Sequence, residues 1–256
     1  MKKLIIGLNA AINTSLATSA FAHDFFLLPG QFTAPVAESQ VVQASVGSNF
    51  PTPKNVVTAD RVDRLFAAGA GKPQLSVTWP GAKALNLRVT GASRGMVVAA
   101  VKTKDRDVEY AEDRITLILE EYRVSPEAAA AVAALAKPRT LKVSSRRFAK
   151  TILCIEQCSD RAVTARALGS ALEFVAAGSS PDYFRLLSEG RPLANYPVDL
   201  VTADGKRRHL DTDAKGEVRL SANDRGAMML FAAVMTPPAA GERFILDLTT
   251  LTFSRS

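Results

Sequence analysis

The sequence predicts a mainly β protein with two β-sandwich-like parts and a short helical insertion in the first part. Short runs of β-branched and aromatic residues recur along the chain, separated by glycine, proline or serine. Residues 111–136 interrupt this pattern with helix-forming residues, and residues 182–256 return to closely spaced strands and turns. We therefore expect an N-terminal β-rich domain at 23–178 and a C-terminal immunoglobulin-like or transthyretin-like sandwich at 182–256.

The composition is that of a folded globular chain. Of the 256 residues, 47% are hydrophobic and 22% are charged, which excludes a disordered chain and a disulfide-dense small scaffold. The formal net charge is +7, and most basic residues are spread along the chain near acidic ones. The basic run at 205–209 has no interleaved aromatic residues, so we expect no nucleic-acid partner.

Residues 1–22 have the pattern of a secretory signal peptide. Lys2 and Lys3 form the positive start, an uncharged run follows, and Ala20-Phe21-Ala22 predicts cleavage after Ala22. The alternative is a membrane anchor, but polar residues interrupt the run and no positive stop-transfer cluster follows it. We expect an exported protein with no membrane span after signal cleavage.

The first part is expected to consist largely of short strands. Phe25–Leu28 precedes a Pro-Gly turn, and Gln40–Gly47 alternates in part before a second turn. Further strands with Gly, Pro or Ser at their ends are predicted at 62–67, 74–79, 84–90 and 95–102.

Two helices are expected within residues 111–136. Apolar and charged residues are interspersed from Ala111 to Tyr122 in an amphipathic pattern. Ser125 then fits an N-cap, Pro126 fits the first helical position, and Pro138 ends the second helix. An amphipathic pair of this kind usually lies against a sheet.

Strands resume at 144–156 and 171–176, and residues 177–181 have the small, polar composition of a linker. The Asp204-Gly205 pair is a strong hairpin signal in the part that follows. The strands predicted in this last part are 183–188, 196–202, 207–211, 217–221, 227–235 and 244–253.

Cys154 and Cys158 are the only cysteines of the chain. An even number of cysteines in an oxidising compartment favours a disulfide, and this spacing can bridge a tight turn. A redox pair or a thiolate metal site is the alternative, although redox pairs usually have two intervening residues and a thiolate site needs two further ligands. We expect a structural Cys154–Cys158 disulfide.

The chain has two histidines, His23 and His209, and only His23 is a candidate metal ligand. Cleavage after Ala22 makes His23 the first residue, with an α-amine and an imidazole that can chelate one metal ion. Nitrogen donors of this kind suit copper, nickel and zinc. The alternative is a terminal histidine without a role. His209 follows three basic residues, which favours a surface position over a metal ligand.

Motifs for catalysis are missing from the sequence. It has no Gly-x-Ser-x-Gly elbow, no phosphate-binding loop, no dinucleotide fingerprint and no zinc spacing. The neighbouring acids at 109–113 and 120–121 lie at a helix start or on a helix face, where solvation explains them. We therefore expect a protein that is not an enzyme.

Several motifs occur in the order that is typical of one bacterial periplasmic family. The segment His23–Pro29 resembles the family's Ala-His-Asp/Glu-Phe/Trp-x-x-x-Pro opening, and Val46–Pro51 resembles its Gly-x-x-Phe segment. The remaining similar segments are 110–124, 147–150, 189–194, 212–217 and 251–253. The chain thus resembles domain-of-unknown-function family 4198, whose members are often associated with nickel or cobalt uptake.

The resemblance implies a periplasmic protein that handles a divalent transition metal (nickel, cobalt or copper), with His23 and Asp24 as metal ligands. It also implies an outer-membrane receptor or another envelope protein as a partner. The chain departs from the family pattern at 232–235, where a further histidine is absent, and at Phe26, which replaces a tryptophan. The alternative function is a structural or interaction sandwich of the cell envelope that binds no metal.

Overall fold

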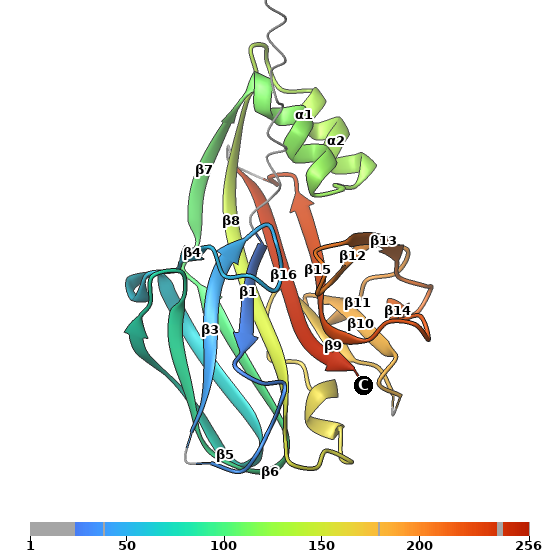
Figure 1. Ribbon diagram of the computed structural model, residues 1–256. Helices are drawn as coiled ribbons and strands as arrows, with labels where there is room; N and C mark the ends of the chain where they lie inside the picture. Colours follow the sequence, from blue (N-terminus) through green and yellow to red (C-terminus); the bar gives the residue numbers. More distant parts are fainter. Residues whose placement is uncertain (1–23, 38, 179, 240–242, 256) are drawn as a thin grey trace, which may run out of the picture.

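The computed structural model describes residues 24–37, 39–178, 180–239 and 243–255. Within these residues the chain is mainly β with two α-helices, as the sequence predicts. Figure 1 shows the strands in packed layers, with both helices at one end of the molecule. The predicted signal peptide, its cleavage site at Ala22 and the candidate ligand His23 lie outside the described residues.

The described chain begins in a buried strand. Strand β1 (Asp24–Pro29) pairs antiparallel with β3 (Ser39–Gly47), and the short β4 (Asn55–Val56) pairs with Ser45 and Val46 of β3. Phe26 contacts the ring of Phe50 edge-on at 5.6 Å between ring centroids. Phe26, at the position where the resemblance suggests a tryptophan, is therefore a core residue.

Two long strands follow where the sequence predicts four short ones. Strands β5 (Val62–Pro80) and β6 (Leu85–Thr103) pair along nearly their whole length. The glycines that suggest strand ends lie instead at irregularities inside the pair, between Gly69 and Gln74. Glycine permits the backbone conformations that a bulge requires, so the strands bend without ending.

A strand and the two helices form the insertion. Strand β7 (Arg106–Ala111), which the sequence did not indicate, pairs with the start of β8 (Thr140–Ile155). Helix α1 (Glu112–Glu121) follows directly, and α2 (Pro126–Ala133) begins with a hydrogen bond from the Ala128 amide to the Ser125 hydroxyl. The helices bury their apolar residues against β7, β8, β15 and β16.

The predicted disulfide is present. Cys154, at the end of β8, is bonded to Cys158, and their Cα atoms are 5.6 Å apart. After this turn, β9 (Leu172–Ala176) and β10 (Tyr183–Ser188) pair antiparallel in a smaller sheet. The smaller sheet also contains β11 (Arg191–Pro192) and β14 (Glu217–Arg219).

The larger sheet runs through both halves of the chain. Its path within the described residues is β1-β3-β6-β8-β16-β15-β12-β13. Strand β16 (Phe244–Arg255) pairs parallel with β8 and antiparallel with β15 (Gly226–Thr236). Strands β12 (Pro197–Thr202) and β13 (Arg207–Asp211) form an edge hairpin. The two predicted parts are therefore joined by one continuous sheet.

Side chains from both sheets form a shared core. It includes Met96 and Ile152 from the first half together with Phe184, Leu200 and Phe253 from the second half. A second cluster fills the space enclosed by β1, β3, β6 and β8. None of the helices in the described part of the chain has the length and apolar character that a membrane crossing needs.

Candidate functional site

The sequence-predicted ligand Asp24 opens β1 and is 3% exposed. Its carboxylate forms an ion pair with the Arg207 guanidinium, which comes from β13. The same guanidinium reaches Asp199 on β12, with 2.8 Å between Nη1 and Oδ2. It also lies over the Phe231 ring, 5.2 Å from its centroid. Arg207 therefore joins the first described strand to the edge hairpin, and the Asp24 carboxylate is occupied by this contact.

Asp199 also fixes the one histidine within the described residues. The Nδ1 atom of His209 lies 2.6 Å from Asp199 Oδ1, while the imidazole itself is 63% exposed. A carboxylate on Nδ1 orients the ring and leaves Nε2 toward the outside. His209 is thus an exposed residue, as the sequence predicts, and its basic neighbours Arg207 and Arg208 are paired with acids.

Helix α1 is tied to the same network at its C-terminal end. Arg123 has a φ of +48° just after the helix and donates to Asp199 Oδ1 at 3.3 Å. It also donates to the carbonyl oxygens of Val198 and Leu210. These bonds connect the helical insertion to the β12–β13 hairpin.

Two carboxyl groups in this region have raised pKa values. Burial raises the pKa of Asp24 to about 6, against the opposing effect of Arg207. Burial, and then the charge of Asp24, raises the pKa of Glu121 to about 7. In each group one oxygen, Asp24 Oδ1 and Glu121 Oε1, is buried without a hydrogen-bond partner among the described residues. Two acids whose carboxyl groups are wholly or partly buried, Asp24 and Glu121, therefore lie near the start of β1.

The described residues do not by themselves build a metal centre. No group of three or more His, Cys, Asp or Glu side chains is arranged there to hold a metal ion. Both cysteines are in the disulfide, and the methionines Met228, Met229 and Met235 are buried in the core of β15. A site at the start of β1 therefore depends on His23, which precedes the described residues.

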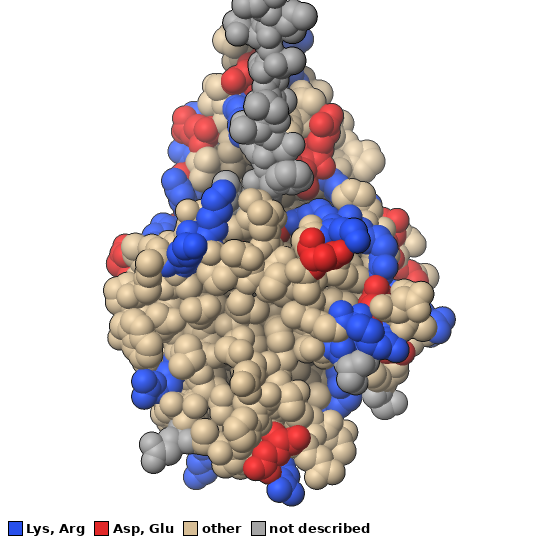
Figure 2. Space-filling model, viewed as in Figure 1, with Lys and Arg blue, Asp and Glu red and all other residues tan. Residues whose placement is uncertain are grey.

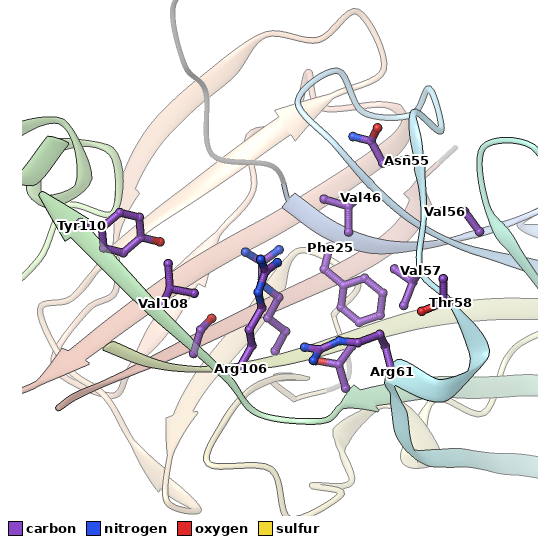
Figure 3. A pocket seen from close by; sticks show the side chains of 13 residues that line it. Phe25, Val46, Asn55, Val56, Val57, Thr58, Arg61, Arg106, Val108 and Tyr110 are labelled. Carbon is purple, nitrogen blue, oxygen red and sulfur yellow. The ribbon is translucent and has the colours of Figure 1, made fainter. Parts of the chain in front are cut away.

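A basic hollow of about 470 Å³ lies on the other side of Phe25. Figure 3 shows Tyr110 and Val108 on one side and Val57 and Thr58 on the other, with Phe25 between them. The other side chains that line it are Val46, Asn55, Val56, Arg61, Thr103, Arg106, Ser145 and Arg147. The lining contains three arginines and no acid. Basic side chains also gather where β4 and β7 meet on the surface in Figure 2.

The sequence does not reveal this hollow, because Arg61 and Arg106 each lie near acids and Arg147 belongs to a short basic run that favours a solvated face. The signal was the alternation Arg106-Asp107-Val108-Glu109-Tyr110. In a strand this pattern sends the arginine, valine and tyrosine to one face and the two acids to the other.

A family model described as a domain of unknown function (DUF4198) matches residues 20–236. The matched range includes the start of β1, the Arg207 network and every residue that lines the basic hollow. Among curated proteins the chain has no match.

Proposed function

The chain belongs to the DUF4198 family of domains of unknown function, and from this premise we propose that it is a periplasmic, non-catalytic binding protein that captures a divalent transition metal. His23, exposed as the first residue after signal cleavage, is the primary ligand. Nickel, cobalt or copper is the cargo, and the role is accessory to uptake, beside an outer-membrane receptor or another envelope protein.

The anchoring of β1 is the observation that carries this proposal. Asp24 is buried and bound by Arg207, and the Thr250 hydroxyl donates to the Phe25 carbonyl oxygen at 2.7 Å. The Thr252 hydroxyl donates in the same way to Leu27, at 2.6 Å. Residue 23 is therefore one peptide unit from a fixed strand. Ordering a short tether costs little conformational entropy, which favours metal binding there.

Proton competition makes the proposed metal binding depend on pH. An α-amine of ordinary pKa, about 7.7–8.0, holds its proton near neutral pH, and a metal ion must displace that proton. We therefore propose that metal affinity rises from pH 6 to pH 8.

Calorimetric titration of the processed protein with Ni²⁺ and Cu²⁺ tests the proposal. We expect binding to native protein, and its loss in His23→Ala. His209→Ala is the matched control, and should retain binding because that imidazole is held by Asp199. Equal binding by native protein and His23→Ala, or none by either, would refute the metal function.

The second candidate is a structural or interaction sandwich of the cell envelope without metal. It is favoured by the lack of a metal-holding cluster in the part of the chain that the structure describes. Affinity capture from periplasmic extracts should then return the same partner protein with and without a chelator. Mass spectrometry of the exported protein is needed for either candidate, because it establishes whether the chain starts at His23.

A further inference from the structure

The basic hollow beside Phe25 differs in charge from the other hollows around it. The hollow of about 260 Å³ next to Arg146 also contains Asp247 and Glu189, and Arg146 is paired with Asp247. In the hollow of about 470 Å³, Arg61, Arg106 and Arg147 face the space with no acid in the lining. A recess lined by one sign of charge concentrates ligands of the opposite sign.

Strand β7 keeps its own acids away from this hollow. Arg106, Val108 and Tyr110 line it, whereas Asp107 and Glu109 on the opposite face form ion pairs with Arg243 at 3.2 and 3.1 Å. The Arg106 side chain forms no hydrogen bond or ion pair with any residue that the structure describes. Arg61 uses one guanidinium nitrogen on the Lys104 carbonyl oxygen, at 3.0 Å, and has further donors.

A buried hydroxyl gives a second, independent indication of a ligand. Ser145 is 5% exposed, lines the hollow, and its Oγ atom has no hydrogen-bond partner among the described residues. Ser145 is the cross-strand partner of Arg106, so both side chains lie on the same face of the sheet. Buried polar groups are normally satisfied, and an unsatisfied one at a cavity wall suits a ligand oxygen.

We propose that this hollow binds a small organic polycarboxylate, with Arg61 and Arg106 on its carboxylates and Ser145 donating to one carboxylate oxygen. Guanidinium groups bind carboxylates through paired, charge-assisted hydrogen bonds. The volume, about 470 Å³, is in the range of small-molecule sites. The apolar wall of Phe25, Val57 and Val108 suits the carbon chain between two carboxylates rather than a compact inorganic anion. The residues that define this site do not include the proposed metal ligand His23.

Calorimetric titration of the processed, metal-free protein with citrate, succinate, acetate and inorganic phosphate tests this site. We expect citrate and succinate to bind at least about tenfold more tightly than acetate or phosphate. Arg106→Gln should weaken citrate binding about tenfold or more. The matched control is Arg191→Gln, which removes the same charge from an exposed position on the smaller sheet and should leave the affinity unchanged.

Ser145→Ala separates a binding role from a folding role. The variant should bind citrate several-fold more weakly while its melting temperature stays the same or rises, because it removes an unsatisfied buried hydroxyl. His23→Ala should bind citrate like native protein, so this experiment can fail or succeed separately from the metal titration.

The proposal would be wrong if phosphate bound as tightly as citrate, or if Arg106→Gln and Arg191→Gln had equal affinities for citrate. It would also be wrong if none of the anions gave a heat of binding at millimolar concentration. Loss of citrate binding in His23→Ala would also overturn it, by locating the ligand at the N-terminus.

Discussion

Glu121 shows how a single side chain at the end of a helix can couple stability to pH. It lies half-buried at the last position of α1, and burial and the charge of Asp24 raise its pKa from 4.5 to about 7. Arg207 and Arg114 oppose this effect without cancelling it. Its neighbour Asp24 is more deeply buried but has Arg207 as a direct partner, whereas Glu121 Oε1 has none among the described residues.

The raised pKa has a definite consequence for stability. Below about pH 4.5 the carboxyl is protonated in both folded and unfolded chains. As the pH rises to about 7, the unfolded chain releases this proton while the folded chain still holds it, so the folded state loses stability. Glutamine is uncharged throughout and avoids this loss.

We therefore predict that Glu121→Gln matches native stability near pH 4 and is about 1 kcal/mol more stable at pH 8, since solvent screening limits the gain at a half-exposed side chain. Urea unfolding at both pH values measures this difference. Glu120→Gln, at the exposed neighbouring position, is the control and should show the same stability difference from native protein at both pH values. A Glu121→Gln gain that is equal at pH 4 and pH 8 would contradict the prediction.

At this scale the sequence predicts residues whose partners are near in the chain. Cys154 and Cys158 are four positions apart, and their disulfide follows from the spacing. The partner of Asp24 is 183 positions away in Arg207, and no local pattern indicates that contact. The family resemblance gives Asp24 as a metal ligand, which stays a prediction, and in the structure its carboxylate has an arginine partner. For Ser145 the sequence contains no comparable signal, because its environment depends on the pairing of β7 with β8.

The helices and strands also show that features set by nearby residues are predicted well, whereas features set by distant residues are not. Helix α2 begins where the capping and proline signals place it, because Ser125 and Pro126 act within one turn, and α1 lies within the amphipathic stretch 111–122. Strands β5 and β6 were predicted as separate pieces, because glycine commonly marks a strand end. Here Gly69 instead allows the two backbones to approach closely: a Cβ atom added to it would lie 2.3 Å from the Met96 carbonyl oxygen.

This close approach makes Gly69→Ala a test of the long β5–β6 pair. The φ of Gly69 is +145°, and the added methyl group would collide with backbone atoms that cannot move independently. We predict a loss of more than about 2 kcal/mol in the free energy of unfolding. Denaturant unfolding followed by circular dichroism measures it.

Gly30→Ala is the control for this substitution. A Cβ atom at Gly30 has only the Val41 carbonyl oxygen near it, at 3.9 Å, an ordinary contact. Its stability should stay within about 0.5 kcal/mol of native protein. Similar losses in the two variants would mean that Gly69 has no special role in the pairing.

For the whole molecule, strand pairing joins the two predicted parts although the composition of residues 177–181 suggests a linker between them. Residues 177–181 look like a domain boundary in sequence, yet β9 and β10 on either side of them are paired neighbours. Beyond them, β16 pairs parallel with β8 from Phe244↔Val143 to Thr252↔Thr151. Parallel pairing between strands so far apart in the sequence cannot be deduced from hydrophobic patterns, which report only which face of a strand is buried.

The continuous sheet predicts that the chain unfolds as one unit. Residues 182–256 alone would lack β6, β8 and β9, so Phe184, Leu200 and Phe253 would lose the partners that they have in the shared core. Burial of such side chains supplies most of the stability of a domain of this size. We expect a single calorimetric transition for the processed protein, and no near-ultraviolet circular dichroism for the isolated fragment 182–256. Mixing this fragment with residues 23–178 should restore the signal, which would show that the fragment lacks a partner rather than being damaged. Two separate transitions, or a folded fragment by itself, would instead support two independent domains divided at 178–182.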